Sequence, residues 1–149
     1  MAERRQPSTR GAYKAFRTVT TRWADNDVYG HMNNVVHYAL FDSAVNQYLI
    51  EEGALDIREG QQIGLVVETR CSYFAEMAYP DVVHAGLRAD YVGNSSITYG
   101  IGLFRNDDDK AAAEGQFTHV YVDRQSRRPQ PLSDALRSAA NAIATEQAA

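Results

Sequence analysis

The 149-residue sequence has a single cysteine, Cys71, and only four prolines and one tryptophan. One cysteine excludes an intramolecular disulfide and a four-cysteine zinc site. Positive charge is not in excess either, because 19 acidic residues outnumber 15 basic ones and give a formal net charge of −4. Without a basic footprint, nucleic acid is not an expected partner. This cysteine usage fits the reducing cytoplasm, where we expect the protein to be located.

Long hydrophobic runs are also absent. No segment of the sequence approaches the roughly 20 apolar residues that cross a membrane. Met1 to Gly11 is polar and arginine-rich and lacks the apolar stretch of a secretory signal. A membrane is therefore not an expected partner. We expect residues 1–12 to form a flexible arm and residues 13–149 to form one domain, because 44% hydrophobic residues suffice for a single core.

The longest regular pattern in the sequence predicts a helix from Asn33 to Glu52. Its apolar residues recur around most of the helix girth and do not form a single stripe, which indicates a helix surrounded by protein. Asn33 or Asn34 is placed to cap the start of this helix, and Gly53 is placed to end it.

Strand patterns lie on both sides of this helix. A composition rich in β-formers predicts a strand from Tyr13 to Trp23. After the helix, alternating residues and short turn-forming links predict four further strands, at Ile63 to Phe74, Asp81 to Val92, Ser96 to Arg105 and Ala112 to Asp123. A short helix capped by Ser133 follows. This order predicts an α+β fold in which an antiparallel sheet wraps around one helix.

The junction between the first strand and the long helix concentrates the polar chemistry of the chain. The first N–H groups of a helix have no partner within it and lie at its positive end, so they can stabilise a carbonyl oxygen that gains negative charge. Asp27 lies a few residues upstream. Its carboxylate could attack the same carbonyl carbon or activate a water molecule. The junction therefore predicts acyl-transfer chemistry.

The stretch ADNDVYGHMNN, residues 24–34, resembles the signature loop of the 4-hydroxybenzoyl-CoA thioesterase family. A weaker likeness covers YFAEMAYPDV, residues 73–82. The resemblance implies a hotdog fold, five antiparallel strands around a long central helix, and the activity of an acyl-CoA thioesterase. It assigns the catalytic carboxylate, as nucleophile or general base, to Asp27 and the amide that binds the carbonyl oxygen to Asn34. It also implies an acyl-CoA substrate held at the subunit interface of a homodimer or homotetramer, and no cofactor or metal.

Other residues of the motif have both functional and structural interpretations. His31 could orient Asp27, the thioester or a water molecule, or could pack locally. Gly30, Asn33 and Tyr38 are candidates for substrate binding, although a turn, a helix cap and the core would equally explain them. In the family, the hairpin between the third and fourth strands often touches CoA; the matching residues here are Asn94, Ser95 and Ser96.

Four alternative interpretations stand beside thioester hydrolysis. Asp25, Asp27 and His31 could suggest a metal site, but no fourth ligand lies nearby and His37 is expected to face elsewhere on the helix. The pair of aspartates also matches the nucleophile motif of haloacid-dehalogenase-type phosphatases, whose βαβ context is absent. A hotdog hydratase or dehydratase, and a module that binds acyl-CoA or acyl carrier protein without turnover, share the expected fold.

Overall fold

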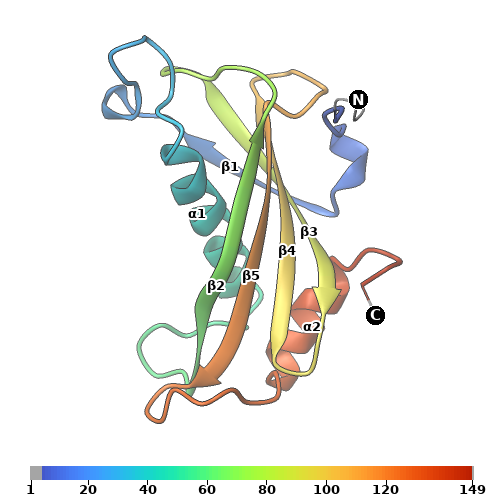
Figure 1. Ribbon diagram of the computed structural model, residues 1–149. Coiled ribbons are helices and arrows are strands. Elements are labelled where there is room, and N and C mark those ends of the chain that lie inside the picture. Colours follow the sequence, from blue (N-terminus) through green and yellow to red (C-terminus); the bar gives the residue numbers. More distant parts are fainter. Residues whose placement is uncertain (1–4, 149) are drawn as a thin grey trace.

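A computed structural model describes residues 5–148 (Figure 1). It contains one five-stranded sheet in which all neighbouring strands are antiparallel, in the order β1-β3-β4-β5-β2. The strands and helices are β1 (Ala15–Thr20), α1 (Val36–Glu51), β2 (Gln62–Tyr73), β3 (Val82–Val92), β4 (Ser96–Arg105), β5 (Ala113–Asp123) and α2 (Asp134–Ala142). The short edge strand β1 and the long edge strand β2 therefore lie at opposite sides of the sheet.

The long helix α1 packs against one face of the sheet and forms the centre of the core. Phe41, Ala44 and Val45 are fully buried on this helix. Gly115 on β5 leaves room for the Phe41 ring, because a side chain at this position would overlap that ring. The sheet curls around one side of α1, whereas Ala39, Ser43 and Ile50 on its other side are exposed, so within one chain the helix is not surrounded by protein as predicted. The arrangement confirms the predicted α+β class and the hotdog fold.

The second helix, α2, lies on the same face of the sheet as α1. The Tyr48 hydroxyl of α1 donates a 2.7 Å hydrogen bond to the Ala139 carbonyl of α2. Ser133 caps α2, as predicted, since its hydroxyl accepts a hydrogen bond from the Leu136 N–H. The outer face of the sheet is covered differently. There the Tyr13 ring lies directly over Gly102, which has no side chain to displace it.

The predicted flexible arm lies partly outside the described residues. Its described part packs on the outer face: the Ser8 N–H donates to the buried carboxylate of Glu114, and Arg5 forms an ion pair with the same group. Residues 5–12 are thus held against the sheet. Within residues 5–148, no helix is both long and apolar enough to cross a membrane.

Two predicted boundaries are corrected by the structure. The first strand ends at Thr20, and Trp23–Asp25 forms a single 3-10 turn, because the Asp25 carboxylate accepts a hydrogen bond from the Arg22 N–H and folds the chain back. The long helix begins at Val36 and not at Asn33, because residues 33–35 form a separate turn in which the Asn33 side chain accepts from the Val35 N–H. Its predicted end is confirmed: Gly53 follows with φ +71°.

Candidate active site

The loop between β1 and α1 folds into a tight turn around Asp27. The Asp27 N–H donates to the His31 carbonyl at 2.9 Å, and the Gly30 N–H donates to the Asp27 carbonyl at 3.1 Å. Gly30 has φ +84°, a conformation that residues with a side chain rarely adopt. The turn is therefore a sufficient explanation for Gly30, and it holds Asp27 and His31 on the same side of the loop.

The Asp27 carboxylate has one engaged oxygen and one oxygen free of backbone donors. Oδ1 accepts a 2.8 Å hydrogen bond from the Tyr29 N–H. Oδ2 lies 3.9 Å from His31 Nδ1, and the side chain is 19% exposed. That imidazole nitrogen also lies 3.2 Å from the Met32 carbonyl, which can only accept, so Nδ1 carries a proton directed between the two oxygens.

Asp25 has a structural position in the same loop. Its side chain is 3% exposed and accepts hydrogen bonds from both the backbone and the guanidinium of Arg22. Its carbonyl accepts from the Asn33 N–H. These contacts connect the start of the loop to its end. Asp25 thus shapes the loop, which agrees with the prediction that Asp27 is the chemical member of the pair.

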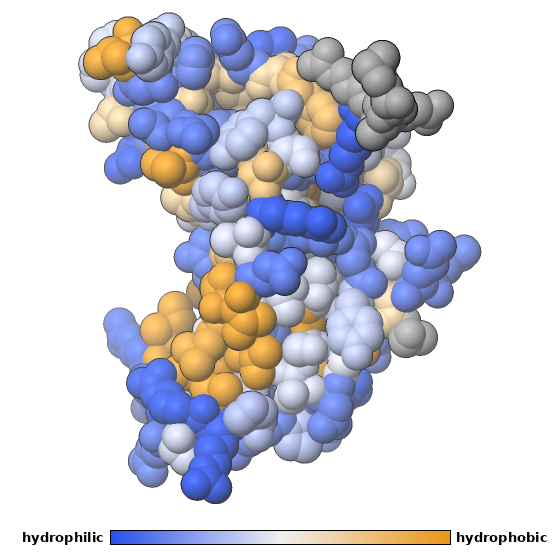
Figure 2. All heavy atoms as spheres, viewed as in Figure 1, coloured by the Kyte–Doolittle hydropathy of each residue, from blue (hydrophilic) through white to orange (hydrophobic). Residues whose placement is uncertain are grey.

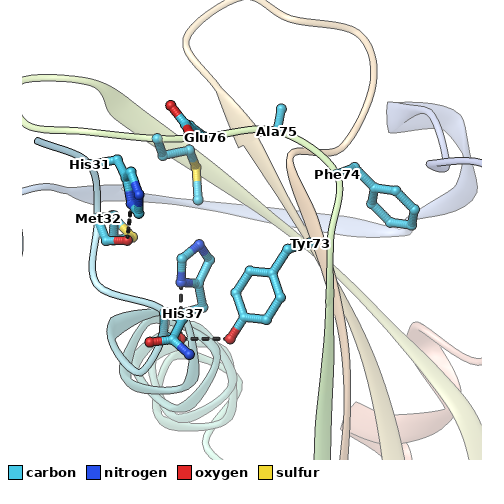
Figure 3. A pocket seen from close by; sticks show the side chains of 9 residues that line it. His31, Met32, His37, Tyr73, Phe74, Ala75 and Glu76 are labelled. Atoms are coloured by element: carbon cyan, nitrogen blue, oxygen red, sulfur yellow. Dashed lines mark hydrogen bonds between the residues drawn. The ribbon is translucent and has the colours of Figure 1, made fainter. Parts of the chain in front are cut away.

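A pocket of about 330 Å³ opens beside this loop, between the start of α1 and the segment that follows β2 (Figure 3). Its wall is formed by His31, Met32, Asn34, His37, Tyr73, Phe74, Ala75, Glu76 and Met77. Two of these residues, His31 and Asn34, are predicted site residues. Asp27 is not part of the wall and lies one side chain behind it, next to His31. We call this cavity the helix-start pocket.

Asn34 forms the polar floor of the helix-start pocket. Its carbonyl accepts two hydrogen bonds, from the Tyr73 hydroxyl at 2.7 Å and from His37 Nδ1 at 3.2 Å. Both lone pairs of this carbonyl are therefore in use. The Asn34 N–H, by contrast, has no hydrogen-bond partner within residues 5–148. A free backbone donor thus lies at the pocket, in the turn that leads into α1.

His37 was expected to face elsewhere, and the structure corrects this expectation. Its ring lines the helix-start pocket, is 3% exposed and meets the Tyr73 ring edge to face, with centroids 4.7 Å apart. Burial lowers the pKa of His37, against the smaller opposing effect of the hydrogen bond to Asn34.

The remaining predicted residues do not gather at the pocket. Asn33 stabilises the turn before α1, and Tyr38 packs its ring edge against Phe41 on the helix. Asn94, Ser95 and Ser96 form the β3–β4 hairpin near the start of α2, where the Asn94 carbonyl accepts from the Leu132 N–H. Figure 1 shows this hairpin at the opposite end of the sheet from the β1–α1 loop. Within one chain, these three residues are distant from Asp27.

The described residues contain no preformed metal centre. No group of three or more His, Cys, Asp or Glu side chains in residues 5–148 is arranged to hold a metal ion. The chemical groups at the pocket are instead the Glu76 carboxylate, two imidazoles, the Tyr73 hydroxyl and the residue with the free N–H, Asn34, and the Asp27 carboxylate lies behind His31. A base or nucleophile next to a free donor is an arrangement suited to attack on a carbonyl group.

The fold and this pocket define a class of protein. Residues 21–140 match the model of the thioesterase-like superfamily, and the chain belongs to that superfamily. The match is broader than the 4-hydroxybenzoyl-CoA thioesterase family that the loop resembles.

Among individual proteins, the chain is similar to the PA5185 protein of Pseudomonas aeruginosa strain PAO1. The crystal structure of that protein has 48% sequence identity and a TM-score of 0.92, over 94% of this chain and 98% of that one. Slr0204 of Synechocystis, a 1,4-dihydroxy-2-naphthoyl-CoA thioesterase, has a TM-score of 0.77 over 85% of this chain and 94% of that one; at 17% identity this shows a shared fold alone. The uncharacterized protein YsmA of Bacillus subtilis (strain 168) is 23% identical over 123 residues, 83% of this chain and 82% of that protein.

Proposed function

We propose that the protein is an acyl-CoA thioesterase of the 4-hydroxybenzoyl-CoA thioesterase type, which hydrolyses an acyl thioester to the free acid and CoA. Asp27 acts as the nucleophile or as the general base, and the Asn34 N–H donates to the thioester oxygen. No cofactor or metal takes part. The observation that carries this proposal is the free Asn34 N–H, because it lies at a pocket bordered by the Asp27–His31 pair.

Asn34 is suited to stabilise the developing oxyanion. A preorganised backbone donor near the start of a helix gains from the helix dipole and needs no rearrangement when charge develops. The donor is held in place because the carbonyl of the same peptide unit, that of Asn33, accepts a 2.9 Å hydrogen bond from the Val36 N–H.

Asp27 is suited to the second half of the reaction. Its Oδ2 accepts no backbone hydrogen bond and is partly exposed, so a lone pair is available for attack or for a proton. His31 lies between this oxygen and the pocket and orients it through the proton on Nδ1. The same geometry is suited to direct attack on the thioester carbon and to activation of water. Oxygen isotope labelling of the product acid in a single turnover would distinguish these two mechanisms.

Asp27→Asn is the direct test of this assignment. The amide keeps the size of the side chain and the hydrogen bond from Tyr29, but it is neither a base nor a nucleophile. We expect thiol release from the preferred acyl-CoA to fall by about 10² or more. Asp42→Asn, which removes an exposed carboxylate from α1, is the matched control and should keep wild-type turnover. Binding of acyl-CoA without hydrolysis by the wild type would point instead to a binding module.

We also propose that the enzyme is a dimer formed through β2. This edge strand carries Leu65, Val66 and Val67, which are 39%, 48% and 59% exposed. Figure 2 shows an apolar patch over the part of β2 near its start. A long, apolar strand edge is a template for pairing with a second strand. Antiparallel pairing of two copies would place the Tyr73 end of one β2, with its pocket, beside the Gln62 end of the other.

Val67→Asp tests this assembly. A charge in the paired edge should shift the protein to monomers in sedimentation velocity, and thioesterase activity should fall with the dimer fraction. Thr18→Asp places the same charge on β1, the opposite edge strand, and should change neither quantity. A Val67→Asp variant that sediments like the wild type would exclude pairing through β2.

A further inference from the structure

The helix-start pocket contains an imidazole that the proposed function has not yet used, that of His37. The ring comes from the first turn of α1, three residues after Asn34. Figure 3 shows its far edge directed into the space between His31 and Tyr73. His37 therefore lies between His31, the neighbour of the proposed base Asp27, and Tyr73, which binds Asn34, the residue of the proposed oxyanion donor.

The hydrogen bond to Asn34 determines which nitrogen of His37 carries the proton. His37 Nδ1 lies 3.2 Å from the Asn34 carbonyl, and a carbonyl oxygen can only accept. Nδ1 must therefore be protonated. Because burial keeps the ring neutral at neutral pH, Nε2 has a free lone pair and is an acceptor.

Nε2 has no hydrogen-bond partner among residues 5–148. Nevertheless, Nε2 of His37 is not fully buried, in contrast to the unpaired Nε2 of His119. The atom is thus reachable from the pocket. An acceptor at this position complements the donors of a water molecule, and the residue whose carbonyl orients His37, Asn34, also carries the free N–H.

We propose that His37 is a further catalytic residue, whose Nε2 accepts a hydrogen bond from the attacking water and holds it against the acyl carbon. This role rests on the proposed function. In the general-base route, the water oxygen bonds to the acyl carbon, one water proton passes to Asp27, and the other stays hydrogen-bonded to His37. The C–S bond then breaks and the thiolate takes the proton from Asp27.

In the nucleophilic route, Asp27 bonds to the acyl carbon and the C–S bond breaks, which releases the CoA thiolate to take a proton from solvent. The same water then attacks the acyl group on Asp27. The C–O bond to Asp27 breaks, and the released carboxylate takes a water proton. His37 keeps the same hydrogen bond in both routes and neither gains nor loses a proton. Its contribution is to orientation, so its loss should lower kcat with little change in KM.

Three substitutions separate this role from a structural one. His37→Phe keeps a ring but removes both nitrogens. His37→Asn can still donate to the Asn34 carbonyl but has no acceptor at the position of Nε2. His37→Gln is longer and carries an amide oxygen close to that position. We expect kcat to fall roughly 10- to 10²-fold in His37→Phe and His37→Asn, and only a few-fold in His37→Gln.

Rescue by glutamine and not by asparagine, with KM unchanged, would support the proposal. Rescue by asparagine would overturn it, because the hydrogen bond to Asn34 would then be the one that matters. Equal kcat in all four proteins would also overturn it. Nitrogen NMR of the wild type should show the Nδ1–H tautomer at His37, and the opposite tautomer would contradict the argument independently of activity. If the wild type hydrolyses no thioester, the proposed function fails as well, whereas wild-type turnover that is indifferent to His37 removes only this role.

Discussion

The chain buries two histidines almost equally, His37 at 3% and His119 at 4% exposure, in very different surroundings. His37 Nδ1 is bound to a backbone carbonyl, and its other edge faces a pocket. His119 on β5 lies among aromatic rings, with Phe117 4.8 Å and Tyr99 5.4 Å away by centroid. Its Nε2 is fully buried and has no partner within residues 5–148.

These surroundings suit His37 to a chemical role and make His119 a residue that affects stability. A buried imidazole with a nitrogen at an open pocket can bind a water molecule or a substrate group. His119 has its Nδ1 3.4 Å from the Tyr121 hydroxyl, but its Nε2 is buried without a partner in an aromatic layer, so the ring is costly to protonate. Burial lowers the pKa of His119 to about 4, although the Asp42 carboxylate partly opposes the shift. The two residues should therefore respond differently to substitution.

The largest expected effect in this comparison is the acid sensitivity contributed by His119. Between pH 6.5 and about 4 the unfolded chain binds a proton that folded His119 excludes, so stability is complete above pH 6.5 and decreases as pH falls. The shift corresponds to a loss of roughly 3 kcal/mol by pH 4. We expect the free energy of unfolding, measured with urea at pH 7 and pH 4 at one protein concentration, to decrease less in His119→Phe than in the wild type.

His37→Phe provides the contrast in the same assay. We expect its unfolding free energy at pH 7 to stay within about 1 kcal/mol of the wild type, since one hydrogen bond is lost and the ring is kept. His119→Phe should keep thioesterase activity, and His37→Phe should lose it. A His119→Phe variant with the wild-type slope of stability against pH would show that His119 is protonated without penalty in the folded state.

Much of the fold could be predicted from the sequence because its patterns are local and strong. The run of apolar residues predicted the long helix, although one side of α1 is exposed and not surrounded by protein. Period-two alternation predicted strands close to β3 and β4. The errors fell at the β1–α1 loop, where side chains determine the backbone. A capping asparagine at residue 33 predicts a helix start, yet its side chain closes a separate turn and the helix begins at Val36.

The site was predicted only in part, for the same reason. Asp27, His31 and Asn34 belong to one contiguous motif; His31 and Asn34 line one pocket, and Asp27 lies behind His31. His37 was missed because the apolar girth of α1 left its orientation undefined. Tyr73 lies 39 residues from Asn34, and a contact over this distance depends on how β2 lies beside α1. No local pattern in the sequence reports such a contact.

Tyr73→Phe gives the smallest of the expected effects and tests how the pocket floor is held. The Asn34 carbonyl keeps its hydrogen bond from His37, so no buried acceptor is orphaned, and the free energy of unfolding should fall by no more than about 1 kcal/mol. The Asn34–Val35 peptide becomes freer to rotate, and this motion reaches the Asn34 N–H through the shared Asn34 Cα, so kcat should fall about 3- to 10-fold with the pocket intact. Tyr91→Phe is the matched control, because this tyrosine of β3 is 49% exposed, against 44% for Tyr73, and lies outside the pocket wall. If the two variants have equal kcat, His37 alone suffices to hold the Asn34 peptide, and the rigidity of the floor does not depend on β2.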